Sequence, residues 1–272
     1  MRSRHSSLRL RWKRAEKGVG AEKGVGRRKR GRESFCLTAP AAWRSFAACR
    51  DVCALLLAAL SYHVLNRAVA RARIFDKSMD YAAFERVLKQ ADAFVPMRLL
   101  AYCILSNHWH LVLWPFHDGD LSEYLRWLTV THTQRWHAHR HTAGTGALYQ
   151  GRFKSFPVQA DEHFLAPCRY VERNPLRANL VKQAETWRWG SLWHRVHGTA
   201  DRLLAPWPVA IPSVWVEHVN APQSESELAS LRRCVTRGSP YGEEGWRMAT
   251  AETLGLQSTL RPRGRPRILL SR

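Results

Sequence analysis

Acidic side chains are scarce in this chain of 272 residues. Its 22 Asp and Glu are outnumbered by 43 Lys and Arg, which gives a formal net charge of +21 at pH 7. Such an excess favours a polyanionic partner, most simply nucleic acid. Residues 1–33 hold thirteen of the basic residues against three Glu, and the rest of the positive charge is spread over the body of the chain.

Paired cysteines and long apolar runs are also missing. The six cysteines include no Cys-x-x-Cys pair and have no secretory context, which predicts reduced thiols in a cytosolic protein. Val52–Leu60 is an apolar run of nine residues, too short to cross a bilayer and too far from the N-terminus for a signal peptide. We therefore expect no membrane partner.

Composition divides the chain into four predicted segments. These are a basic low-complexity arm with an atypical alanine-rich continuation (1–60), the main folded domain (61–200), a linker (201–223) and a helical extension with a basic tail (224–272). The arm repeats Ala-Glu-Lys-Gly-Val-Gly in tandem. It is open whether this arm binds nucleic acid loosely, is upstream sequence translated from a wrong start codon, or is a transit peptide.

Apolar periodicity predicts an α+β fold. Strands are expected at Ser61–Arg67, at Met97–Leu105, from His108 after the turn Ser106-Asn107, and at Arg152–Gln159. Helices are expected from Asp76 or Ser78 to about Phe94, from Asp118 or Asp120 to about His137–His141, and at Asp161–Asn174, Glu225–Val235 and Glu243–Leu254. This order predicts a ferredoxin-like antiparallel sheet with helices on one face.

One strand carries a histidine pair. Strict alternation places His108, His110, Val112 and Trp114 on the same face. Two imidazoles so spaced can hold one divalent cation, although an isolated His-x-His is more often a pair of core or surface histidines. No acidic residue follows His110 closely, which argues against a hydrolytic zinc enzyme.

A tyrosine and an asparagine are candidates for the other half of such a site. Tyr170 and Asn174 lie four residues apart on a predicted helix, so they share a face. Tyrosine can attack phosphorus, and the amide oxygen of Asn174 is a third, hard ligand. The alternative for Tyr170 is a core aromatic with a solvated hydroxyl.

A resemblance favours the catalytic reading. The stretch Arg169-Tyr-Val-Glu-Arg-Asn-Pro-Leu-Arg-Ala, together with Asn107-His-Trp-His-Leu, resembles the REP-associated tyrosine transposases, single-strand DNA transposases of the HUH nuclease superfamily. Tyr62-His-Val-Leu-Asn-Arg and Tyr149-Gln-Gly-Arg-Phe-Lys-Ser match in the same order, and the similarity covers about residues 61–270.

The resemblance implies roles for particular residues. His108 and His110 would hold a divalent metal ion, Mg²⁺ or Mn²⁺, with Asn174 completing the site. Tyr170 would form a 5′-phosphotyrosine. The substrate would be single-stranded DNA with palindromes that fold as hairpins, and the protein would be a monomer or homodimer in the bacterial cytoplasm, associated with the nucleoid.

Basic residues elsewhere are candidate DNA contacts. Gln150, Arg152 and Lys154 alternate with Phe153 and Phe156 nearby, a pattern that suits single-stranded DNA and equally a half-buried edge strand. Arg177 follows Pro175 and would lie near the site. Arg263 and Arg265 in the tail are candidates for groove or backbone contacts.

The sequence thus predicts a metal-dependent transposase that nicks and rejoins hairpin DNA. One departure from the family is Pro167, which is predicted to kink the helix three residues before Tyr170. The alternative function is a decayed or domesticated protein that still binds hairpin or duplex DNA in a regulatory role.

Overall fold

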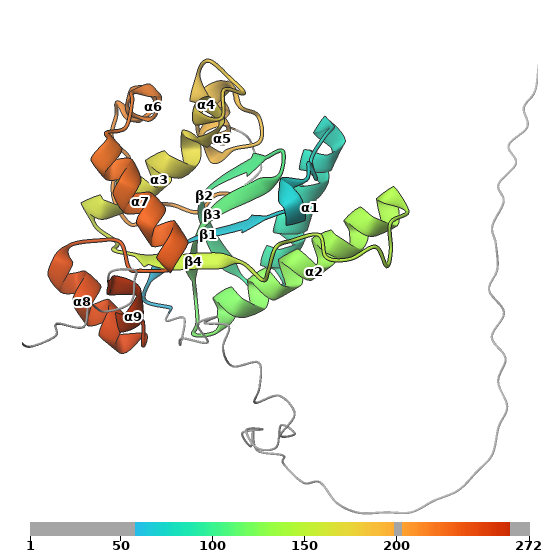
Figure 1. Cartoon of the computed structure of the whole chain (residues 1–272). Helices are drawn as coiled ribbons and strands as arrows, with labels where there is room; N and C mark the ends of the chain where they lie inside the picture. The colour runs from blue at the N-terminus through green and yellow to red at the C-terminus, as the bar shows by residue number, and fades with distance from the viewer. Residues whose placement is uncertain (1–57, 199–202, 262–272) are drawn as a thin grey trace, which may run out of the picture. The chain divides into compact units, whose positions relative to one another are not determined.

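A four-stranded antiparallel sheet forms the centre of the described chain (Figure 1). The computed structural model describes residues 58–198 and 203–261, all within the unit Asp51–Arg272. The sheet has the order β2-β3-β1-β4, with strands β1 (Ser61–Arg67), β2 (Met97–Leu105), β3 (His108–Pro115) and β4 (Lys154–Val158).

Two long helices cover one face of this sheet. Helix α1 (Ser78–Phe94) connects β1 to β2, and α2 (Asp120–Arg140) connects β3 to β4. Both bury apolar stripes against the sheet, where Phe84 of α1 packs in one core with Tyr62 and Trp109 of the strands. The β-α-β-β-α-β order and the antiparallel pairing confirm the predicted ferredoxin-like α+β fold, with its two core helices on one face.

The opposite face is also covered, by helices that follow the core. Val112 and Phe156 of the sheet pack there with Phe164, Cys168 and Leu231. The later helices are α3 (Leu165–Glu172), α4 (Asn174–Arg177), α5 (Ser191–His197), α6 (Trp215–Asn220), α7 (Glu225–Arg237), α8 (Glu244–Thr253) and α9 (Gln257–Leu260). Because α3 and α7 both contact the sheet, the second face is shielded from solvent as well.

The predicted hairpin and the start of the first helix are confirmed. Leu105 pairs with His108, so β2 and β3 are joined by the two-residue turn Ser106-Asn107. Helix α1 begins at Ser78 because the Asp80 carboxylate accepts the backbone N–H groups of Asp76 and Lys77, which satisfies donors left open before the first helical turn.

The predicted strand Arg152–Gln159 is shorter in the structure. Strand β4 begins at Lys154 and ends at Val158, so Gln150 and Arg152 precede it. The side-chain amide of Asn66 donates to the carbonyl oxygens of Gly151 and Arg152. The two carbonyl oxygens are therefore already bonded, whereas in a longer β4 they would be open to the backbone N–H groups of β1.

The predicted helix Asp161–Asn174 is divided. A 3₁₀ turn (Glu162–Phe164) precedes α3, which ends at Glu172, and α4 follows with Pro175 in its first turn. Pro167 is the third residue of α3, where a backbone N–H has no partner within the helix. The expected kink before Tyr170 is therefore wrong, because Pro167 removes no helical hydrogen bond.

The segment predicted as a linker is packed. Trp207 donates its indole N–H to the Leu100 carbonyl, and the Ala205 backbone N–H donates to Leu99. Trp215 of α6 is buried and bonds the Glu172 carboxylate. Residues 203–223 thus pack against β2 and α3 through bonds, these three among them, that composition does not reveal, while the division into domains stays a prediction.

Some predictions lie outside the described residues. They are the basic arm before residue 58 and the tail contacts Arg263 and Arg265. Within the described part of the chain, no helix is long and apolar enough to cross a membrane.

Candidate active site

The second face of the sheet carries the histidine pair. Pairing of β1 with β3 sets Arg67 opposite His108, Leu65 opposite His110 and His63 opposite Val112. Since side chains alternate along each strand, the three β1 residues and both histidines share one face. Lys154 of β4 pairs with Leu65, so a single row across the sheet runs from Lys154 through Leu65 to His110.

The three histidines of this face form a connected group. His63 Nε2 and His110 Nδ1 are 3.0 Å apart and share a hydrogen bond. His108 Nδ1 donates to the Asn107 side-chain oxygen at 2.6 Å. Each member of the pair therefore has its Nδ1 engaged, and the Nε2 atoms are the ones left to bind a ligand.

The imidazoles are held neutral. Burial lowers the pKa of His63 and of His108 to about 3, and it also holds the pKa of His110 well below its ordinary value. The guanidinium of Arg177 adds to all three shifts, and that of Arg67 adds to those of the pair. Neutral imidazole is the form that ligates a metal ion.

Helix α3 brings Tyr170 to the histidines. The Tyr170 ring lies edge-on to His110, with centroids 5.8 Å apart, and edge-on to His63 at 6.1 Å. Arg169 and Arg173 hold this helix in place, since they donate to backbone carbonyls of residues 219–222 around α6. The tyrosine is 6% exposed.

Arg177 links Tyr170 to Asn174. Its guanidinium carbon lies 4.2 Å from the centre of the Tyr170 ring, and its Nη2 donates to Asn174 Oδ1 at 2.5 Å. The Asn174 amide nitrogen donates to the Tyr170 carbonyl. The structure therefore places Asn174 beside Tyr170, as predicted, with its oxygen bonded to Arg177.

Unpartnered polar atoms concentrate at this group. Among the described residues, six buried side-chain nitrogens have no hydrogen-bond partner. Four of them belong here: His63 Nδ1, Arg67 Nε, His110 Nε2 and Arg177 Nη1. Because buried donors and acceptors without partners are costly, such a cluster is typical of a ligand site.

The donor set fits a divalent ion in part. The unpartnered His110 Nε2 and the engaged Nδ1 atoms of both histidines meet the requirement for imidazole ligands. Within residues 58–198 and 203–261, no three His, Cys, Asp or Glu side chains are grouped to hold a metal. A third protein ligand would be the amide of Asn174, once released from Arg177.

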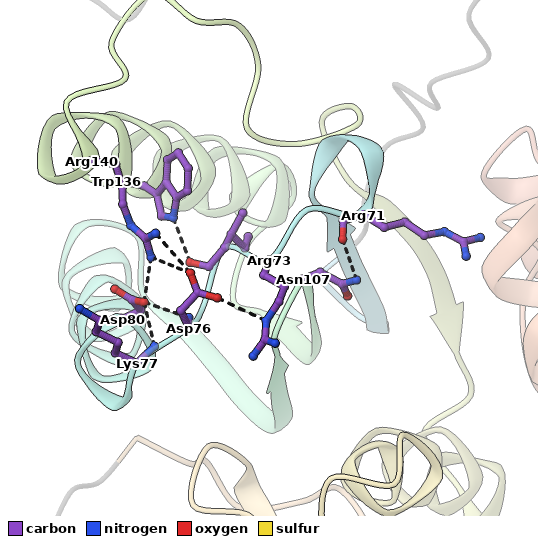
Figure 2. A network of polar contacts seen from close by, with 9 residues as sticks. Arg71, Arg73, Asp76, Lys77, Asp80, Asn107, Trp136 and Arg140 are labelled. Carbon is purple, nitrogen blue, oxygen red and sulfur yellow. Dashed lines mark hydrogen bonds and ion pairs between the residues drawn. The ribbon is translucent and has the colours of Figure 1, made fainter.

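The turn after β1 supports His108 through Asn107. Ala70 and Arg71 adopt left-handed backbone angles, with φ of 52° and 57°, where glycine is favoured. The Asn107 amide donates to the Arg71 carbonyl and its oxygen accepts from His108, so one side chain joins this turn to the histidine. Figure 2 shows the Arg71 side chain extending away from the surrounding polar network.

The same network fixes the segment that follows the turn. Arg140 of α2 bonds the carboxylates of Asp76 and Asp80, and Arg73 pairs with Asp76 at 3.3 Å (Figure 2). Trp136 donates its indole N–H to the Ile74 carbonyl. These contacts anchor the turn on α2, on the far side from the histidines.

The predicted DNA contacts are placed unequally. Gln150, Arg152 and Lys154 are all exposed, but only Lys154 belongs to a strand and shares the face of the histidines. Phe156 is buried against His63, with ring centroids 4.8 Å apart, so it offers no surface for stacking on a base. Arg177 lies in the site, as expected.

Sequence reasoning missed His63, Arg67 and Asn107. His63 and Arg67 lie four positions apart on one strand, an even spacing that by alternation places them on a common face. What the sequence does not give is that this strand pairs with β3 in the register that brings His63 to His110. Asn107 belongs to the predicted turn and to the motif Asn107-His-Trp-His-Leu, but neither predicts that its side chain bonds His108.

Comparison with known families adds an independent finding. Residues 57–174 match the family model described as Transposase IS200 like. This stretch, less than half of the 272 residues, is similar to that family. The matched stretch includes His63, His108, His110, Tyr170 and Asn174, whereas Arg177 lies just beyond it. No protein of curated function matches the chain.

Two solved structures are similar to parts of this chain. A REP-associated tyrosine transposase bound to a REP hairpin shares 19% identity, with a TM-score of 0.45 over 62% of this chain and 92% of that one. A protein of Deinococcus radiodurans R1 assigned as a transposase shares 16% identity, with a TM-score of 0.32 over 42% of this chain and 89% of that one.

Proposed function

We propose that this protein is a transposase that cleaves and rejoins single-stranded DNA through Tyr170. One observation carries the proposal: Tyr170 lies against a group of histidines and arginines that contains four of the six unpartnered buried nitrogens in the described residues. A core tyrosine packed only for stability would have neighbours whose polar atoms are satisfied.

The chemistry is a transfer of one phosphodiester bond. The Tyr170 oxygen attacks the scissile phosphorus, and the bond from phosphorus to O3′ breaks. The downstream strand stays joined to the tyrosine through its 5′ phosphate, and the proton lost by the tyrosine ends on the freed 3′-hydroxyl of the upstream strand. Rejoining is the reverse, with a 3′-hydroxyl attacking the phosphotyrosine. The phosphotyrosine link conserves the energy of the phosphodiester bond, so rejoining consumes no additional cofactor.

Charge around the tyrosine supports phosphate binding. Arg177 lies over the Tyr170 ring, and Arg67 lies beside His108 on the neighbouring strand. Each has a buried guanidinium nitrogen without a partner, and guanidinium groups bind phosphate oxygens in a fixed geometry. We expect these two residues to orient the scissile phosphate and offset its negative charge.

A divalent ion, Mg²⁺ or Mn²⁺, would be held by His108, His110 and Asn174. When bound, it supplies Lewis-acid polarisation of the phosphate. His63 and Asn107 keep the two imidazoles oriented for such an ion through their bonds to the Nδ1 atoms.

The motifs also support a substrate class. The sequences around Tyr170 and around His108–His110 resemble those of REP-associated tyrosine transposases, which favours palindromic single strands that fold as hairpins. The high net positive charge supports the same partner.

A second candidate is hairpin or duplex DNA binding without cleavage. It is favoured by the bond between Arg177 and the Asn174 oxygen, which occupies the third ligand of the predicted ion. The two functions share a DNA surface and differ in whether a covalent link forms.

A denaturing gel with the full chain separates them. Labelled single-stranded hairpins from repeats that flank the gene are incubated with Mg²⁺ or Mn²⁺, with a perfect duplex of the same sequence in parallel. We expect a metal-dependent, protease-sensitive adduct with the hairpin. Tyr170→Phe abolishes this adduct and changes hairpin affinity by less than about twofold, because only the hydroxyl is removed.

The matched control is Tyr241→Phe, which removes a hydroxyl from a half-buried tyrosine near β4. It keeps full adduct yield. An adduct that survives in Tyr170→Phe contradicts the assignment of the nucleophile. Tight hairpin binding with no adduct from the unaltered chain supports the second candidate, and a preference for the duplex supports a regulatory role.

A further inference from the structure

Helix α7 has two distinct faces. Leu228, Leu231 and Cys234 are buried in the layer shared with α3 and β4. The opposite face presents Arg232, Arg233, Thr236 and Arg237, spaced as one helical stripe, and both Arg232 and Arg233 are exposed. The candidate active site uses none of these residues.

The exposed face of α7 forms one wall of a basic groove. The groove has a volume of about 590 Å³ and is lined by Ala229, Arg232, Arg233, Thr236, Arg237, Leu260 and Arg261. Four of these seven residues are arginines and none is acidic. Arg232 forms an ion pair with exposed Glu225, with 3.9 Å between Nη1 and Oε2.

Two hydrogen bonds join the two helices that contribute to the groove. Arg237 Nε donates to the Thr259 carbonyl at 2.6 Å, and its Nη2 donates to the Ser258 carbonyl at 3.0 Å. These bonds join α7 to α9. Arg232, Arg233 and Arg261 are exposed beside this bonded pair of helices, and a fixed scaffold lowers the entropy cost of binding a ligand.

The groove adjoins the edge strand of the active-site face. Just after α7, a Cβ added at Gly238 would lie 3.3 Å from the Ser155 carbonyl, so the chain passes directly beside β4 there. Ser155 follows Lys154, which belongs to the row that leads through Leu65 to His110. The C-terminal end of α7 therefore lies beside β4, next in sequence to exposed Lys154.

We propose that the α7–α9 groove binds the sugar-phosphate backbone of the DNA that extends beyond the cleavage position. The inference rests on the proposed function for its choice of DNA. Arginine pairs phosphates bidentately, and such contacts position a strand without reading its sequence. The groove is therefore a sequence-independent second binding site, used only by DNA long enough to reach it.

The test compares DNA length and salt dependence. The full chain is titrated with fluorescent single strands of about 12 and about 40 nucleotides, of mixed sequence. In Arg232→Gln/Arg233→Gln, the Kd for the long strand rises about tenfold and the salt slope falls by about 1.5, as loss of two phosphate contacts requires. Affinity for the short strand is unchanged.

The control is Arg86→Gln/Arg126→Gln, which removes the same charge from exposed positions on α1 and α2. We expect it to change the affinity for the long strand by less than about twofold, because salt screens charges that lie far from the bound DNA. Equal losses in both double variants, or no loss in either, overturn the groove as a DNA site. Adduct yield at saturating hairpin is read separately, so the absence of cleavage contradicts the proposed function and leaves the groove result standing.

Discussion

His132 is buried on one side of the sheet and His110 on the other. The two histidines differ in whether their ring nitrogens have hydrogen-bond partners. On the α1–α2 face, His132 stacks on Phe75 and accepts the Tyr149 hydroxyl at 2.7 Å, while Trp109 donates to the same hydroxyl. On the α3 face, His110 shares a bond with His63 and keeps a buried Nε2 without a partner.

Burial alone does not separate these two roles. It lowers the pKa of His132 to about 3, as it does for His63 and His108. What distinguishes the α3 face is its unpartnered nitrogens together with nearby arginines. The comparison teaches that hydrogen-bond accounting separates the two faces more sharply than a perturbed pKa does.

The largest expected effect is from His110→Phe. The substitution keeps a ring of similar size and removes both nitrogens, so we expect the rate of adduct formation to fall by about 10³-fold. The free energy of unfolding should change by less than about 1 kcal/mol, because a costly unpartnered atom is lost along with one hydrogen bond. Gel kinetics and urea unfolding of the same preparation measure the two effects.

His132→Ala should give the reverse pattern. It opens a cavity beside Phe75 and takes one partner from the Tyr149 hydroxyl, which we expect to lower the free energy of unfolding by about 2–4 kcal/mol. Cleavage per folded molecule should stay within about twofold of the unaltered chain. The opposite result would be loss of cleavage in folded His132→Ala together with unfolding of His110→Phe. It would assign catalysis to the α1–α2 face and stability to the α3 face.

His63→Phe tests the support of the histidine pair. Without the bond to His110 Nδ1, the imidazole loses its fixed orientation, and we expect Mn²⁺ affinity to fall by about 10- to 100-fold. Calorimetric titration of the full chain with Mn²⁺ measures this directly. His63→Gln, which retains a hydrogen-bonding side chain, should recover part of the affinity; equal affinity in all three proteins would exclude a positioning role.

Ala70→Gly has the smallest expected effect. Ala70 has a φ of 52°, and glycine adopts this angle without a Cβ clash. We expect a gain of up to about 1 kcal/mol in the free energy of unfolding, since relief of the strain exceeds the added entropy of the unfolded chain. Cleavage should be unchanged. A loss of stability in urea unfolding would show that the turn is not strained.

Much of the core fold could be predicted because its signals are local. The alternation of His108, His110, Val112 and Trp114, and the two-residue turn before them, lie within a ten-residue stretch. The pairing of β1 between β3 and β4 depends on contacts far apart in sequence, so the position of His63 beside His110 could not be read from periodicity.

The errors came from side chains that replace backbone partners. The amide of Asn66 holds the carbonyls that would have extended β4, and Trp207 and Trp215 fasten a proline-rich segment that composition marks as a linker. The expected kink at Pro167 failed because the 3₁₀ turn before α3 moves this proline into the first helical turn. Each of these three features depends on tertiary contacts or on where a helix begins, and the local sequence pattern gives neither.

Identification of the residue that carries DNA tests the central claim most directly. The adduct formed with a hairpin and Mn²⁺ is digested with protease and nuclease, and the modified peptide is sequenced by mass spectrometry. The account predicts a nucleotide joined through its 5′-phosphate to Tyr170. A nucleotide on any other residue, or a 3′-phosphate link, would contradict it.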